Sequence, residues 1–179
     1  MSVKCVFIPP LVLGGAVRRV QARSLTSIKG RMSMGKGHES DKLVGTWKLV
    51  SASTTTSTGE RSETPYGPSP EGLLTYTADG RVIAMISHGG RKSLSTLAKP
   101  EEQVEAFKTF LAYAGRYRLS CDEVIHTVEI SSIQNYVGRD LVRSVKFQND
   151  QIILVTPPTP VGGKIQIFEL IWQRLPIVS

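Results

Sequence analysis

The chain has 179 residues, of which 40% are hydrophobic and 21% are charged, a composition and length that suit one ordinary folded domain. Its formal net charge of +7 comes from residues 1–38, which hold seven of the 22 Lys and Arg residues and none of the 15 Asp and Glu residues. The rest of the chain is electrically balanced, which argues against a nucleic-acid-binding surface. No apolar run approaches the roughly 18 residues of a membrane-spanning helix.

Residues 1–40 form a basic leader that we expect to lie outside the fold. Arg and Ser without acidic residues, together with short apolar runs, are typical of an organelle transit peptide. Pro9-Pro10 and Arg18-Arg19 interrupt the pattern of a secretory signal. A disordered extension, or a natural start at Met32 or Met34, is the alternative explanation of the segment. We expect a cytoplasmic protein, or a mitochondrial one if the leader is a transit peptide.

Residues 41–175 predict a single β domain, followed by a short tail at 176–179. Extended segments are expected at residues 43–54, 72–77, 81–87, 116–119, 123–131, 141–148, 151–156 and 164–173. The turns Ala78-Asp79-Gly80 and Gln148-Asn149-Asp150 suit tight hairpins, and Pro-rich loops at 64–70 and 157–160 cannot continue a ladder. Sequential strands joined by hairpins favour an up-and-down antiparallel sheet. Eight strands suffice to close a barrel around side chains or one small ligand.

One α-helix is predicted over residues 100–114, between the third and fourth strands. Pro100 suits the first helical position, Glu101 and Glu102 complement the helix dipole, and Gly115 is a natural stop. We expect the helix to pack against the barrel or to cover one end of it. Its expected buried stripe is Val104, Phe107, Leu111 and Ala114.

The alternation of side chains along the strands predicts which of them face the interior. Every second residue of a strand lies on the same face, so an apolar set marks the inward face. Tyr76, His126 and Arg143 share such faces and are candidate ligand-binding residues, because a largely apolar pocket needs only a few polar anchors. Their expected inward neighbours are Gly72, Leu74, Val124, Val128, Ile130, Leu141, Val145 and Phe147.

Each candidate also has a purely structural interpretation. A lone histidine on an apolar face is more often a hydrogen-bonded core residue than a catalytic one. Arg143 can reach the barrel rim or pair with Glu129 or Glu169. Tyr117 is expected to face inward with Leu119, and it is a further candidate ligand-binding residue.

Three residues beside turns and loops are weaker candidates. His88 is expected in a loop beside Gly89-Gly90, and the alternative, from its alternation with the preceding strand, is that it faces the cavity. Tyr113 and Tyr136 can line the mouth, and we keep Tyr136 as a candidate ligand-binding residue. Aromatic side chains at such places commonly only pack.

Several short motifs together carry a family resemblance. Gly45-x-Trp47 on the first strand, with Arg174 after the last, is followed in order by further matching motifs. The chain therefore resembles the lipocalin-like domain proteins (calycin superfamily) of bacteria and filamentous fungi over nearly all of residues 41–175. It departs from their pattern at Tyr136, where Trp is usual, and at Lys99, where Ser or Thr is usual. The further motifs are Tyr66-Gly67, Pro70-x-Gly72-x-Leu74-x-Tyr76, Asp79-Gly80-Arg81, Tyr113-x-Gly115-x-Tyr117, Asn135-Tyr136-Val137-Gly138 and Thr156-Pro157-Pro158.

The resemblance implies a mainly β fold, a single eight-stranded up-and-down antiparallel β-barrel, with Arg174 packed across the Trp47 ring as a structural signature beside Gly45. It also implies a link to secondary metabolism, because fungal members are often associated with gene clusters in which related barrels bind or cyclise polyketide and terpenoid intermediates.

Three functional hypotheses follow. The first is a barrel that binds a small hydrophobic molecule of this kind. The second is a cofactor-independent isomerase or cyclase with His126 and Arg143 as catalytic residues. The third is a non-catalytic structural or regulatory barrel filled by its own side chains. No motif of a metal, nucleotide or hydrolase site is present, so we expect no metal and no cofactor. The sequence leaves the oligomeric state open.

Overall fold

The computed structural model describes residues 41–176, so the expected leader and the tail beyond residue 176 lie outside the described residues. Ten strands, the helix α2 and one 3₁₀-helix lie within them, and residues 41–43 are also helical. The labelled elements are β1 (Gly45–Thr56), β2 (Arg61–Ser62), β3 (Glu71–Tyr76), β4 (Arg81–Ser87), α2 (Pro100–Lys108), β5 (Phe110–Ser120), β6 (Glu123–Ser131), η1 (Gln134–Tyr136), β7 (Asp140–Gln148), β8 (Gln151–Val155), β9 (Thr159–Val161) and β10 (Lys164–Arg174).

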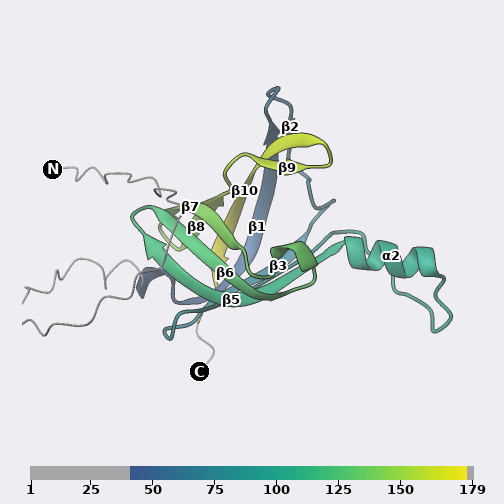
Figure 1. The fold of residues 1–179 in the computed structure, drawn as a ribbon, viewed down its shortest axis with the longest axis horizontal. Coiled ribbons are helices and arrows are strands. Elements are labelled where there is room, and N and C mark those ends of the chain that lie inside the picture. Colours follow the sequence, from purple (N-terminus) through teal and green to yellow (C-terminus); the bar gives the residue numbers. More distant parts are fainter. Residues whose placement is uncertain (1–40, 177–179) are drawn as a thin grey trace, which may run out of the picture.

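The strands form a closed antiparallel barrel of eight (Figure 1), which confirms the predicted fold class. Strands β1, β3, β4, β5, β6, β7, β8 and β10 follow one another around it, and β1 pairs with β10 to close the circle. That last seam runs from the pair Trp47–Arg174 to the pair Thr56–Gln166. The short strands β2 and β9 only extend β1 and β10 at one end.

The two tight hairpins form at the predicted turns. Gly80 has a φ of +83° and its N–H donates to the Thr77 carbonyl, so the turn between β3 and β4 needs the conformational freedom of glycine. Asn149 has a φ of +52° in the turn between β7 and β8, where asparagine tolerates the left-handed region.

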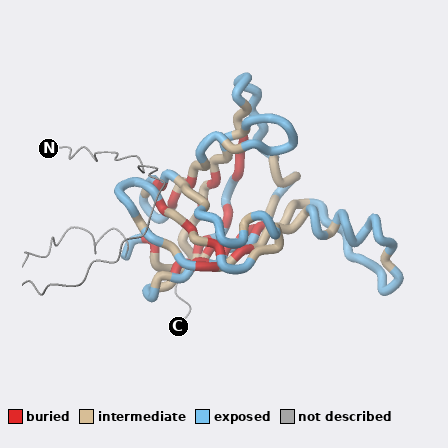
Figure 2. The backbone as a smooth tube through the Cα atoms, viewed as in Figure 1, coloured by how far each residue is buried: buried red, intermediate tan, exposed pale blue. Residues whose placement is uncertain are grey.

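The helix differs from its prediction in length and in position. α2 ends at Lys108 instead of residue 114, because residues 110–116 pair with β4 as the start of β5. Its expected stripe is not buried: Val104 is 49% exposed and Phe107 61%. The helix projects from the barrel wall (Figure 1) and is exposed along its length (Figure 2). The expectation that α2 packs against the barrel is therefore wrong, and of its residues only Phe107 and Lys108 line the opening of the barrel.

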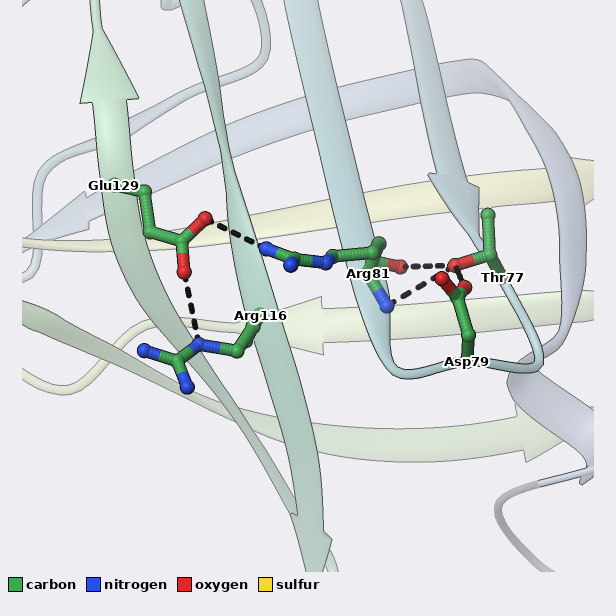
Figure 3. Close-up of polar contacts among 5 residues, drawn as sticks. All are labelled: Thr77, Asp79, Arg81, Arg116 and Glu129. Atoms are coloured by element: carbon green, nitrogen blue, oxygen red, sulfur yellow. Dashed lines mark hydrogen bonds and ion pairs between the residues drawn. The ribbon is translucent and has the colours of Figure 1, made fainter.

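A β-bulge in β6 changes which residues face inward. The pairing of β5 with β6 slips between Ala114–Ile130 and Gly115–Val128, which leaves Glu129 as the extra residue. Ile130, predicted to face the interior, is consequently 68% exposed. Glu129 points outward and bridges Arg81 and Arg116, at 2.7 and 2.8 Å, on the outer surface (Figure 3).

One end of the barrel carries the Gly-x-Trp signature. The Arg174 guanidinium lies 4.1 Å from the centre of the Trp47 ring, and its Nη1 donates to the Val44 carbonyl at 2.6 Å. The Trp47 indole N–H donates to the Leu43 carbonyl at 2.9 Å. A Cβ at Gly45 would lie 2.5 Å from Arg174 Nη1, so the close approach of the arginine requires glycine there.

Candidate functional site

A cavity of about 950 Å³ runs from the opposite rim into the barrel. Its deep residues include Leu74 and Trp172, which are buried on β3 and β10, and its outer residues include Arg61 and Lys164, which are exposed. The inward side chains of the barrel strands are mostly aliphatic and aromatic, so the walls are mainly apolar. The cavity therefore offers a largely apolar interior, in the size range of about 300–1,000 Å³ that ligand pockets occupy.

His126 lies in a buried hydrogen-bonded chain with two tyrosines. It is only 1% exposed, in agreement with the inward position that alternation predicts for it. Its Nε2 lies 2.8 Å from the Tyr76 hydroxyl and its Nδ1 lies 2.8 Å from the Tyr113 hydroxyl. The three residues come from β3 (Tyr76), β5 (Tyr113) and β6 (His126), of which only β5 and β6 are neighbours in the barrel, so the fold brings together groups far apart in sequence.

These three side chains are neutral near pH 7. Burial lowers the pKa of His126 to about 3, and the positive charge of Arg143 acts in the same direction. Burial also raises the pKa of Tyr76 well above its usual value and raises that of Tyr113. At neutral pH this hydrogen-bonded chain of side chains therefore consists of two protonated tyrosine hydroxyls and a neutral imidazole. One ring nitrogen of the imidazole is a hydrogen-bond donor and the other is an acceptor.

Arg143 lines the cavity without a carboxylate partner. It is half-buried on β7, and its Nη1 donates to the Val142 carbonyl at 2.7 Å. Among residues 41–176 no Asp or Glu oxygen comes within ion-pair distance of it. The two partners expected from the sequence are engaged elsewhere, because Glu129 pairs with two other arginines and Glu169 lies 4.0 Å from Arg61. Arg143 therefore places a positive charge in the cavity wall.

The other predicted residues divide between the cavity and the packing around it. Tyr136, on η1, and Tyr113 line the cavity. Tyr117 is not among its described lining residues: its hydroxyl donates to the Thr77 carbonyl at 3.1 Å and its ring packs edge-on against Tyr76. Tyr76 and His126 also lie behind the described lining, and Tyr113 connects them to it.

Two cavity residues were missed or underrated from the sequence. Tyr66, in the Pro-rich loop, lines the cavity and stacks on Phe168 with ring centres 6.1 Å apart. His88 lines it too, edge-on to Tyr66 at 5.3 Å. Burial raises the pKa of Tyr66 to about 12. Tyr66 belongs to one of the family motifs, but its place over the cavity depends on how the loop folds back.

Trp172 contributes an unsatisfied polar group to the same wall. Its indole nitrogen is the one buried side-chain nitrogen or oxygen in the described part of the chain that has no hydrogen-bond partner. Trp172 is itself 2% exposed and lines the cavity. A buried N–H without an acceptor costs about 1–3 kcal/mol.

The described residues carry no sign of a metal centre or of a membrane-spanning helix. Within residues 41–176 no three His, Cys, Asp or Glu side chains are grouped so that they could hold a metal ion. No helix there is both long and apolar enough to span a bilayer.

A closed antiparallel barrel of eight strands with an internal cavity is typical of lipocalin-type β-barrels. Residues 44–175 match the lipocalin-like domain family, and the chain belongs to that family. The resemblance inferred from its motifs is thus confirmed.

Comparison with individual proteins gives one curated relative and similar solved structures. Over 98 residues, half of this chain and 86% of the relative, it is 35% identical to the 4'-hydroxy-3'-methoxypropiophenone carrier protein ppsC of Aspergillus oryzae. A lipocalin-like protein from Bacteroides uniformis aligns at 12% identity with a TM-score of 0.40, over 75% of this chain and 99% of that one. A protein from Bacteroides eggerthii aligns at 12% identity and a TM-score of 0.38, over 74% and 99% of the two chains.

Proposed function

We propose that the barrel binds and carries a small, largely apolar molecule, an intermediate of polyketide or terpenoid type in secondary metabolism. The observation that carries this proposal is the cavity of about 950 Å³, which reaches from the exposed rim to buried residues of the barrel. A barrel filled by its own side chains would leave no such space. The 35% identity to a fungal protein named as a carrier of an aryl ketone supports the choice of ligand class.

An isomerase or cyclase in the same cavity is the weaker candidate. It would need a group that takes a proton from carbon near neutral pH. The pKa of His126 is about 3, which makes its imidazole a weak base, and burial raises the pKa of both tyrosines bonded to it. Arg143 can stabilise a developing negative charge, but a guanidinium has only N–H donors and no lone pair with which to accept a proton.

Binding can be followed by tryptophan fluorescence, because Trp172 lines the cavity and Trp47 lies outside its lining. We expect 4'-hydroxy-3'-methoxypropiophenone, used as the probe, to quench the wild type and to quench the Trp172→Phe variant much less. The same titration, analysed by mass spectrometry, should return the probe chemically unchanged. Conversion of the probe would instead support the catalytic candidate.

A pair of substitutions on one strand separates the cavity from the outer surface. Ala84 lines the cavity, whereas the next residue along the chain, Ile83, is 45% exposed. Ala84→Phe should therefore weaken probe binding at least about tenfold by filling the cavity, and Ile83→Phe should leave it unchanged. Thermal unfolding of both variants controls for loss of the fold. Equal binding by wild type and Ala84→Phe, or absence of any retained ligand in native mass spectra together with no probe binding, would refute the proposal.

A further inference from the structure

The chain of Tyr76, His126 and Tyr113 fixes the direction in which its protons point. A neutral imidazole carries one N–H, so it donates to one tyrosine and accepts from the other. Both ring nitrogens of His126 lie 2.8 Å from a tyrosine hydroxyl, so either tautomer keeps both of these hydrogen bonds. The two tautomers differ only in which tyrosine keeps a hydroxyl proton that is not used within the chain.

Tyr76 cannot keep such a proton without cost. Its side chain is 1% exposed, lies outside the cavity lining, and makes no other hydrogen bond to residues 41–176. If Nε2 of His126 carried the hydrogen, the Tyr76 O–H would be a buried donor without an acceptor, at a cost of about 1–3 kcal/mol. Tyr76 therefore donates to Nε2, and the imidazole hydrogen lies on Nδ1.

At the other end of this hydrogen-bonded chain, the hydroxyl hydrogen of Tyr113 is then not used in a hydrogen bond. The Nδ1–H of His126 donates to the Tyr113 hydroxyl oxygen, which leaves the hydroxyl hydrogen of Tyr113 with no acceptor in the described protein. Unlike Tyr76, Tyr113 lines the cavity, where a bound molecule can supply that acceptor. The unused donor therefore belongs to Tyr113, the one of the three residues that is among the lining residues of the cavity.

We propose that Tyr113 donates this hydrogen bond to a carbonyl oxygen of the bound molecule, so that the cavity selects ketones and related carbonyl compounds over their deoxygenated analogues. The proposal rests on the proposed binding function and adds the ligand group that is recognised and the residue that recognises it. Arg143 is a further donor in this wall, and it has no carboxylate partner among residues 41–176. A ligand with oxygen acceptors can accept hydrogen bonds from the donors of the cavity wall, whereas a pure hydrocarbon cannot.

A matched pair of ligands tests the recognition of the carbonyl. The probes are 4'-hydroxy-3'-methoxypropiophenone and 2-methoxy-4-propylphenol, which differ only in that a CH₂ group replaces the C=O group. We expect the ketone to bind the wild type roughly 3- to 10-fold more tightly, the gain of one net hydrogen bond. In Tyr113→Phe the two affinities should become equal. The control Tyr117→Phe removes a hydroxyl that bonds to the Thr77 carbonyl outside the cavity, and it should keep the preference.

The outcomes separate this inference from the proposed function. Equal binding of both probes to the wild type, or a preference that survives in Tyr113→Phe, would overturn the inference while leaving the binding function intact. Binding of neither probe would instead count against the binding function. A lower carbonyl stretching frequency of the bound ketone in wild type than in Tyr113→Phe would add direct support for the hydrogen bond.

The proton order is testable without any ligand. The ¹⁵N chemical shifts of the His126 ring report which nitrogen carries the hydrogen, and we expect Nδ1–H. An Nε2–H tautomer would overturn the inference whatever the probes do. Tyr76 is a positioning residue in this scheme, because it does not line the cavity but fixes the tautomer. Tyr76→Phe should therefore reduce the preference for the ketone. An unchanged preference would contradict the proposed order of donors and acceptors from Tyr76 through His126 to Tyr113.

Discussion

Acidification should destabilise the barrel through His126. The imidazole has a pKa of about 3 in the folded protein against an ordinary value of 6.5, so between these values the unfolded chain binds a proton that the folded chain does not. This contribution to stability is fully present above pH 6.5 and is lost as the pH falls toward 3. The side chain is 1% exposed, which leaves solvent little opportunity to screen the effect.

The magnitude follows from proton linkage. Each pH unit below 6.5 costs about 1.4 kcal/mol of unfolding free energy for one proton, so pH 5.0 should cost about 2 kcal/mol relative to pH 7.5. That is a large share of the roughly 5–15 kcal/mol by which such domains are stable. Urea unfolding at the two pH values, followed by tryptophan fluorescence, measures the loss.

Two variants isolate the contribution of His126 from other groups. His126→Gln removes the titration while still offering one acceptor and one donor to the two tyrosines, so its stability should change about 2 kcal/mol less between the two pH values. His88→Gln should retain most of the wild-type loss, because His88 is less buried although its pKa is also lowered by burial. Equal losses in wild type and His126→Gln would refute the reasoning. If the Gln variant does not fold, ¹⁵N titration of wild-type His126 decides, and a protonated ring at pH 5 in folded protein is the refuting result.

Three substitutions test the packing. Gly115→Ala should lower the free energy of unfolding, measured in urea, by at least about 2 kcal/mol, because the new Cβ would lie 2.0 Å from the Thr127 carbonyl oxygen. A smaller loss would mean that the backbone at the β-bulge shifts to make room for the methyl group. Phe107→Ser should change stability by no more than about 0.5 kcal/mol, since this ring on α2 is 61% exposed, and a large loss would show that the helix is covered in solution. Arg174→Lys should lower stability by about 1–2 kcal/mol, because lysine cannot both stack flat on Trp47 and donate to two backbone carbonyls; thermal unfolding unchanged from wild type would contradict this.

Local patterns in the sequence determined the strands and most of their inward faces. The bounds of β4 and β6 agree with the predicted segments, and the turns at Gly80 and Asn149 form hairpins, because turn chemistry and a period of two are properties of adjacent residues. The same alternation placed Tyr76 and His126 in the interior. The Gly45, Trp47 and Arg174 signature correctly predicted that the Arg174 side chain packs on the Trp47 ring.

Contacts between distant segments decided the rest. Residues 110–114 carry an acceptable helical pattern, but in the barrel they form β5, because pairing with β4 satisfies their backbone groups. The bulge at Glu129, which exposes Ile130, depends on the register between two strands and leaves no mark in the alternation of either one. The order of the strands around the barrel brings together residues that are far apart along the polypeptide, and this order sets which hydrogen-bond and charge partners meet. For this reason Tyr113 is hydrogen-bonded to His126, and Arg143 has no carboxylate partner among the described residues.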